Sequence, residues 1–207
     1  MVNQSSLKGT LFRKAADLTT RATTGVALGL SANILTEDKL PYLSKLPSFQ
    51  SYGAMALMSM IALADKVDGT LARASARFGR PITKKDKDRD PLHDKLRYHA
   101  LTASSAFMLA QSHTTLGIAL AAVEIPLVVR DVRITNQRRY AADDVETAAT
   151  TFTKFKTGLL NGALIETMSP ATAHPVGQIG ALVLHGIGAG AAMLSGSIAD
   201  KKSESLR

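Results

Sequence analysis

The sequence predicts an all-α fold: one membrane domain, residues 1–207, with about six transmembrane helices. Two observations lead to this prediction. Apolar stretches of helical length recur along the chain between short polar connections, and no strand pattern is visible. In addition, Lys and Arg are concentrated in alternate connections, which is the charge distribution of a polytopic membrane protein.

Six apolar stretches mark the expected helices. A bilayer core needs roughly 20 residues of helix, and several stretches reach that length only with Thr, Ser, Gly and flanking polar residues. Small residues are common where membrane helices pack closely. These lengths leave a soluble, Ala-rich helical bundle as the alternative. In order, the stretches are residues 20–35, which is the weakest, 52–64, 100–110, 115–129, 159–168 and 176–198.

The distribution of charge argues against the soluble bundle. If the chain has six spans with both termini on one side, all but two of its 25 Lys and Arg residues fall on that side. The two exceptions are Lys39 and Lys45. Basic connections stay in the cytoplasm when a membrane protein inserts, so residues 66–97, residues 130–156 and both termini are expected there. A soluble bundle has no reason to sort charge in this way.

Composition excludes several other classes of protein. The chain has no Cys, which rules out disulfides, thiolate zinc sites and a cysteine nucleophile. Residues 1–24 are polar and basic, so no cleavable signal peptide is expected. The net charge of +8 would suit nucleic acid, but aromatic residues make up only 5% and the charges lie in separated connections. We therefore expect membrane lipid, and no nucleic acid, as the partner.

Two aspartates follow the second apolar stretch, in the segment DKVDGTLAR at residues 65–73. Asp65, Asp68, Gly69 and Ala72 fall on one helical face, at the spacing i, i+3, i+4, i+7. Carboxylates there can hold Mg²⁺ or Mn²⁺, which prefer oxygen ligands and also take phosphate oxygens. The two small residues leave room for a ligand against the backbone. A polar helix end with solvated charges is the alternative.

A second pair of aspartates opens the next apolar helix. The pattern predicts Asp90 as its N-cap and Pro91 as its first residue, with Asp94 one turn further on the same side. Two helices would then each bring two carboxylates to the cytoplasmic face. Four acids that converge without compensation repel one another, so metal is their natural partner. Simple capping is the alternative, and it explains Asp90 but not the other three.

These residues resemble the signature of the CDP-alcohol phosphatidyltransferase family, D-x2-D-G-x2-A-R-x8-G-x3-D-x3-D. The resemblance implies transfer of a phosphatidyl group from a CDP-linked lipid to an alcohol, with release of CMP. It also implies Asp94 as the general base and contacts of Gly69, Ala72 and Arg73 with the CDP moiety. The implied ligands of Mg²⁺ or Mn²⁺ are the four matching aspartates, Asp65, Asp68, Asp90 and Asp94.

The match is poorer in the connection between the two pairs. The family's second Gly stands four residues before the third Asp, whereas Gly79 stands eleven residues before Asp90. A basic insert, residues 81–89, lengthens the connection and leaves open whether activity is altered or lost. Asp86 and Asp88 are rival candidates for the third acid. We prefer Asp90 because Asp-Pro-x-x-Asp-Lys also matches how family members commonly read there.

Further along the chain, Lys and Arg gather in two segments that we expect near the aspartates. Cations there would suit a phosphate on the acceptor alcohol, although positive-inside charge explains any single one equally well. The segments resemble those of phosphatidylglycerophosphate synthases within the family, with Asp131 in place of Glu and Thr153 in place of Gly. The candidate ligands of the acceptor phosphate are Arg130, Arg138, Lys154 and Lys156.

This second resemblance implies CDP-diacylglycerol as the donor and glycerol 3-phosphate as the acceptor, in phospholipid biosynthesis. The two departures leave another acceptor open: inositol phosphate, inositol or a lipid. A non-catalytic membrane protein that keeps the fold also stays open. The expected site faces the cytoplasm from an integral membrane protein, and a homodimer is compatible with this expectation.

Overall fold

The structure is a computed structural model, and it describes residues 4–36, 46–80, 84–140 and 151–204. Within these ranges the chain is all-helical, as the sequence predicts, and contains no strand. Six long helices and one short 3-10 helix follow one another. They are α1 (Gln4–Thr36), α2 (Tyr52–Arg77), α3 (Lys84–Ser112), α4 (Thr114–Tyr140), α5 (Thr151–Thr167), η1 (Pro170–Ala173) and α6 (Pro175–Glu204).

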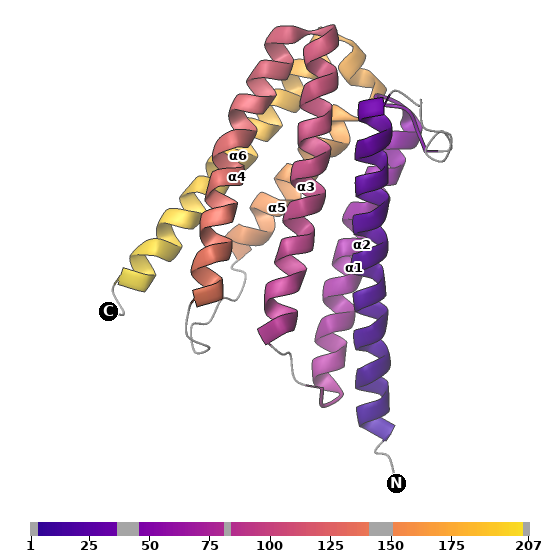
Figure 1. The fold of residues 1–207 in the computed structure, drawn as a ribbon, viewed down its shortest axis with the longest axis vertical. Helices are drawn as coiled ribbons and strands as arrows, with labels where there is room; N and C mark the ends of the chain where they lie inside the picture. Colours follow the sequence, from indigo (N-terminus) through magenta and orange to yellow (C-terminus); the bar gives the residue numbers. More distant parts are fainter. Residues whose placement is uncertain (1–3, 37–45, 81–83, 141–150, 205–207) are drawn as a thin grey trace.

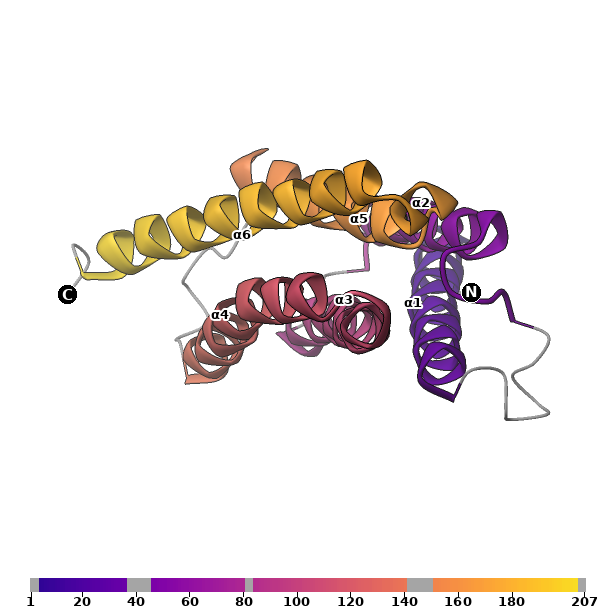
Figure 2. The ribbon, with the colours of Figure 1, turned by 90° about the horizontal axis from the view of Figure 1, so that it is seen from above.

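The long helices run alternately up and down (Figure 1). α1, α3 and α5 begin, and α2, α4 and α6 end, toward the lower end of this view. Seen from above, α5 and α6 lie in one layer and α3 and α4 in a second, with α1 to one side (Figure 2). α1 packs against α2 and α3, α3 against α4, and α5 against α6. The basic ends of the helices therefore share one end of the bundle.

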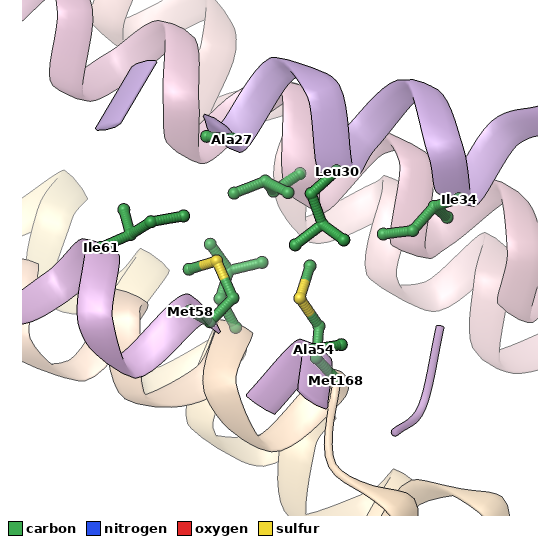
Figure 3. Close-up of a cluster of buried hydrophobic side chains, with 9 residues drawn as sticks. Ala27, Leu30, Ile34, Ala54, Met58, Ile61 and Met168 are labelled. Atoms are coloured by element: carbon green, nitrogen blue, oxygen red, sulfur yellow. The ribbon is translucent and has the colours of Figure 1, made fainter. Parts of the chain in front are cut away.

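A buried apolar cluster lies between α1, α2, α3 and α5 (Figure 3). On α1 and on α2 its residues recur every three or four positions, so each helix turns one continuous face toward the other. The members are Ala27, Leu30 and Ile34 of α1, Ala54, Met58 and Ile61 of α2, Leu101 of α3, Leu164 of α5 and Met168 just after it.

The buried face of α2 changes character along its length. Its core residues at 54, 58 and 61 are separated by steps of four and three, and the same steps continue to Asp65 and Asp68. Asp68 is buried and Asp65 is half-buried. The face that carries the core thus carries two predicted metal ligands one and two turns later, where α1 and α3 meet carboxylates instead of apolar side chains.

The first turns of α1 are fixed to the end of α2. The Ser75 hydroxyl donates a hydrogen bond of 2.7 Å to the Gly9 carbonyl oxygen, and the rings of Phe12 and Phe78 stack with their centroids 5.4 Å apart. A Cβ at Gly9 would lie 3.0 Å from the Phe78 carbonyl oxygen, so a larger residue would push the helices apart. These contacts, here called the α1–α2 clasp, make the basic N-terminal segment part of the bundle.

One segment, Pro175–Leu194 of α6, is long and apolar enough to cross a membrane, and no other helix within the described ranges meets the same standard. The expectation of about six spans is therefore not confirmed. The remaining helices contain many Ala, Gly, Ser and Thr residues, and several carry charged residues over their last turns. Such helices have the length of a span, but not the apolar composition that identifies one.

Candidate active site

Asp68 lies at the contact between α1 and α2. Its side chain is buried, and the Thr20 hydroxyl of α1 donates a hydrogen bond to its Oδ2. Burial raises the pKa of Asp68; the hydrogen bond from Thr20 opposes this shift, and the neighbouring Asp65 carboxylate adds to it. A carboxylate in such surroundings is stabilised more by a nearby positive charge than an exposed carboxylate is.

Arg97 connects three helices at this point. Its Nη2 donates to Oδ1 of Asp65 on α2, at 2.7 Å, and also to Oδ1 of Asp94 on α3. Its Nη1 donates to the Thr23 hydroxyl of α1 at 2.7 Å. The sequence pattern did not identify this residue. The signal was a charged residue one turn before the buried Leu101, on the face where α3 should be apolar.

Threonine hydroxyls of α1 line the same region. Besides Thr20 and Thr23, the Thr24 hydroxyl lies 3.1 Å from Nδ1 of His93 on α3. None of these threonines was expected to belong to the site. The available signal was four threonines in residues 19–24, at the start of the weakest apolar stretch, but helical periodicity alone does not say which helix faces them.

Asp65, Asp68, Asp94 and Arg97 are here called the aspartate cluster. The chemistry of this cluster fits a divalent cation. Oδ1 of Asp65 and Oδ1 of Asp94 both accept hydrogen bonds from one guanidinium nitrogen, so a positive charge already lies between two carboxylates. Burial and the Asp65 carboxylate raise the pKa of Asp94 to about 7, although Arg97 acts in the opposite direction. Two carboxylates that share one cation lack counter-charge, which Mg²⁺ or Mn²⁺ would supply through bonds to oxygen.

The cluster is not arranged around an ion. Among the residues whose side chains the structure describes, no three potential metal ligands are gathered at one point. Arg97 engages Asp65 and Asp94, and the hydroxyl of Thr20 engages Asp68. The donor set is thus suitable in kind and lies on facing helices, but metal binding requires these side chains to exchange partners.

The beginning of α3 corrects one expectation. Asp90 is not the N-cap, because α3 begins at Lys84 and the residues before Pro91 are already helical. In residues 84–90, Lys and Arg stand three or four positions from Asp, and such pairs of opposite charge stabilise a helix. Position 90 is still one turn before Asp94 on the same face. The choice of third ligand stays a prediction, because the described side chains do not include Asp86, Asp88 and Asp90.

The residues predicted to contact the nucleotide follow on α2. A Cβ at Gly69 would meet Nη1 of Arg73 at 3.4 Å. Arg73 is exposed, and its Nη2 donates a hydrogen bond of 3.0 Å to the Thr70 hydroxyl. Ala72 is half-buried. A ligand that approaches the α2 backbone at Gly69 therefore arrives beside an accessible guanidinium group.

A second charged network, here called the Asp131 network, lies on α3 and α4. Nη1 of Arg130 donates to Oδ1 of Asp131 at 2.7 Å, and Nε2 of His99 lies 3.4 Å from Oδ2. Nζ of Lys95 donates to the Asp131 carbonyl oxygen at 2.9 Å. Burial opposes ionisation of Asp131, but the nearby His99 and the surrounding cations outweigh it and lower its pKa.

Two of the four acceptor-phosphate candidates belong to this network. Arg130 contacts Asp131 directly, and the charge of Lys156 on α5 also lowers the pKa of Asp131. The side chains of Arg138 and Lys154 lie outside those described, so their role stays a prediction. The network adjoins the aspartate cluster, because Lys95 directly follows Asp94 in α3.

Comparison with known proteins agrees with the motif. The sequence model described as CDP-alcohol phosphatidyltransferase matches residues 30–191, which is well over half of the chain. The matched region includes the charged residues of both networks but not Thr20, Thr23 and Thr24 of α1. No curated protein and no solved structure matches the chain. The matched family consists of phosphotransferases for substituted phosphate groups, so the protein is an enzyme of that class. The chain belongs to the CDP-alcohol phosphatidyltransferase family.

Membership in the family states the chemistry at a general level. Its members transfer a phosphatidyl group from a CDP-alcohol to an alcohol acceptor, and they are associated with membranes. They use divalent metals.

Proposed function

We propose that the enzyme transfers the phosphatidyl group of CDP-diacylglycerol to glycerol 3-phosphate and releases CMP, as a step of phospholipid biosynthesis. The observation that carries this proposal is that two networks with opposite needs for charge lie side by side. The clustered carboxylates of α2 and α3 share one arginine and need more positive charge, and the cations around Asp131 suit a negative ligand. A metal-bound diphosphate fits the first network, and a phosphorylated acceptor fits the second.

The donor would bind where α2 and α3 meet. A divalent ion there would neutralise the CDP diphosphate and the charge that develops on the departing CMP. Gly69 and Ala72 would let the nucleotide lie against α2, and the exposed Arg73 would contact it. The proposed ligands of Mg²⁺ or Mn²⁺ are Asp65, Asp68, Asp90 and Asp94.

Asp94 is suited to take the proton of the acceptor hydroxyl. Its side chain is 44% exposed, so a substrate can reach it. In the metal-free protein, burial and the Asp65 carboxylate raise its pKa to about 7, so its oxygens are more basic than those of an ordinary aspartate. The deprotonated oxygen then attacks the β-phosphorus. A new P–O bond forms as the bond from this phosphorus to the bridging oxygen breaks, and CMP leaves with the electron pair.

The acceptor phosphate would be bound by the cations of the Asp131 network. Arg130 and Lys156 would bind it, and Arg138 and Lys154 are proposed to complete the site. The carboxylate of Asp131 supports this arrangement, because its contact with Arg130 holds that guanidinium in one orientation. Charge-assisted hydrogen bonds to phosphate would favour glycerol 3-phosphate over a neutral alcohol.

Release of CMP by the purified protein tests this function. The assay supplies CDP-diacylglycerol and, in separate reactions, glycerol 3-phosphate, inositol phosphate, inositol or no acceptor. We expect the highest kcat/KM with glycerol 3-phosphate. A higher value with inositol phosphate would change the acceptor and keep the family chemistry. Absence of CMP release with every one of these acceptors would contradict the proposed reaction.

We further propose that the bundle crosses the membrane six times, with the site at the cytoplasmic face. Large apolar side chains on the outer surfaces of α4 and α6 support this, and Val176 is 82% exposed. Exposed apolar surface of this kind marks contact with lipid or another protein, and the charge pattern favours lipid. The other exposed large apolar residues of these two helices are Ile118, Ile125, Val128, Val129, Val132, Ile179, Val183, Ile187, Met193 and Leu194.

Cysteine labelling in intact cells tests the topology, because the chain has no Cys of its own. Lys85→Cys places a thiol near the start of α3, and His113→Cys places one between α3 and α4. An impermeant maleimide should label position 113 in intact cells and position 85 only after the membrane is opened. Labelling of position 85 from outside would contradict the proposed orientation.

A further inference from the structure

A buried arginine stands between the predicted metal ligands. Arg97 is only 6% exposed, and its three contacts come from Thr23 of α1, Asp65 of α2 and Asp94 of its own helix. A buried guanidinium is stable only where acceptors meet its N–H groups. Two of the acceptors here are carboxylates, which would repel each other if the arginine were absent. Arg97 and the two aspartates therefore stabilise one another.

The position of Arg97 matters for any cation that binds afterwards. Oδ1 of Asp65 and Oδ1 of Asp94 accept from the same nitrogen, Nη2. These atoms are two of the oxygens that a divalent ion would seek. An arriving ion thus meets a positive charge already in place, and like charges within a few ångströms repel each other.

We propose that Arg97 is the resident counter-ion of the aspartate cluster. It holds α1, α2 and α3 together while no divalent ion is bound, and it competes with the ion for Asp65 and Asp94. This inference rests on the proposed metal-dependent function. If this is so, the protein stays folded without metal. It also binds metal less tightly than the same carboxylates would if Arg97 were absent.

The direction of one measured change separates this role from a purely structural one. If Arg97 only positions Asp65 and Asp94, its loss should weaken metal binding because the ligands lose their arrangement. If Arg97 competes with the ion, its loss should strengthen metal binding because a nearby positive charge is gone. The same loss should make the fold dependent on metal, since the ion then becomes the main counter-charge.

The experiment compares wild type, Arg97→Gln and Arg97→Lys, with Arg77→Gln as the matched control at an exposed position of α2. Mn²⁺ binding is followed by electron paramagnetic resonance of the free ion, and thermal unfolding is recorded in chelator and in Mn²⁺. We expect Arg97→Gln to bind Mn²⁺ about tenfold more tightly than wild type. Its Tm should be lower in chelator and should rise more on addition of Mn²⁺. Arg97→Lys keeps the charge, so its affinity should stay near that of wild type.

Several outcomes would overturn the inference. Equal or weaker Mn²⁺ binding by Arg97→Gln would do so while leaving the proposed metal site intact. Absence of Mn²⁺ binding by every variant would overturn the competition and the metal site together. If Arg97→Gln is too unstable to purify in chelator, the double variant Arg97→Gln with Asp65→Asn decides. Removal of one carboxylate should restore part of the lost stability, and no restoration would count against the counter-ion role.

Discussion

Two aspartates on neighbouring helices, Asp94 and Asp131, are both partly buried and both touch an arginine, yet their pKa values shift in opposite directions. For Asp94, burial and the Asp65 carboxylate outweigh Arg97, and the pKa rises to about 7. For Asp131, burial is outweighed by His99 and three cations, and the pKa falls. The contact with one arginine is common to both, so it is the remaining neighbours that decide the sign.

This comparison suggests how two adjacent faces of α3 could serve the two proposed ligands. Asp94 lies in the aspartate cluster, which lacks positive charge. Lys95, the next residue, points into the Asp131 network, which is rich in positive charge. A divalent cation and a phosphate would each complete the network that lacks it. The distance between donor and acceptor sites is then set by one step along a helix, not by a flexible connection.

The largest expected effect on activity is at the aspartate cluster. Asp68→Asn keeps the shape of the side chain but removes a proposed metal ligand, so CMP release should fall by about a thousandfold or more. The folded protein should remain in the membrane, and excess Mg²⁺ or Mn²⁺ should not fully restore activity. Near-normal turnover of this variant would mean that the first network does not bind the metal.

The same assay decides which acid of the insert region belongs to the site. We expect Asp90→Asn to lose activity as Asp68→Asn does, because position 90 shares the face of Asp94. Asp86→Asn and Asp88→Asn are the matched controls and should stay close to wild type. Loss in Asp86→Asn, with full activity in Asp90→Asn, would show that the aspartates of α3 had been aligned wrongly.

A smaller effect on activity is expected at the Asp131 network. Lys156→Ala removes one charge-assisted bond to the acceptor, worth roughly 1.5–3 kcal/mol, so kcat/KM for glycerol 3-phosphate should fall by about tenfold to a hundredfold. The KM for the CDP-lipid should change little. Saturation curves are measured for each substrate separately. Equal losses for both substrates, or none for either, would remove the reason for assigning the acceptor phosphate to this network.

The smallest expected effect comes from pH and concerns Asp94. Because its pKa is raised to about 7, Asp94 is mostly ionised at pH 8 and mostly protonated at pH 6. Metal binding must then displace the proton, so Mn²⁺ affinity should weaken by about tenfold between pH 8 and pH 6. Titrations with Mn²⁺ at several pH values test this. Asp94→Asn should bind more weakly and show a flatter dependence; the same slope in that variant would assign the proton to another group.

The sequence predicted those features that depend on one helix at a time. The order of the helices and the shared face of Asp65 and Asp68 follow from periods of 3.6 residues. The roles of Thr20 and Arg97 did not follow, because they depend on which helices face α2 and at what height. The predicted start of α3 was wrong for another reason. Pro91 was taken as the first residue of the helix, whereas the helix begins at Lys84, in a segment with pairs of opposite charge.

The α1–α2 clasp has a consequence that reaches well beyond its own contacts. Both helices carry their inward residues in alternating steps of three and four, so α1 could slide along α2 by one turn and still find a face to pack against. The contacts of Ser75 with Gly9 and of Phe78 with Phe12 oppose such a slip, because they are made in only one register of the two helices. They fix which threonine of α1 stands opposite Asp68. Residues that touch no ligand thereby determine which α1 side chains belong to the site.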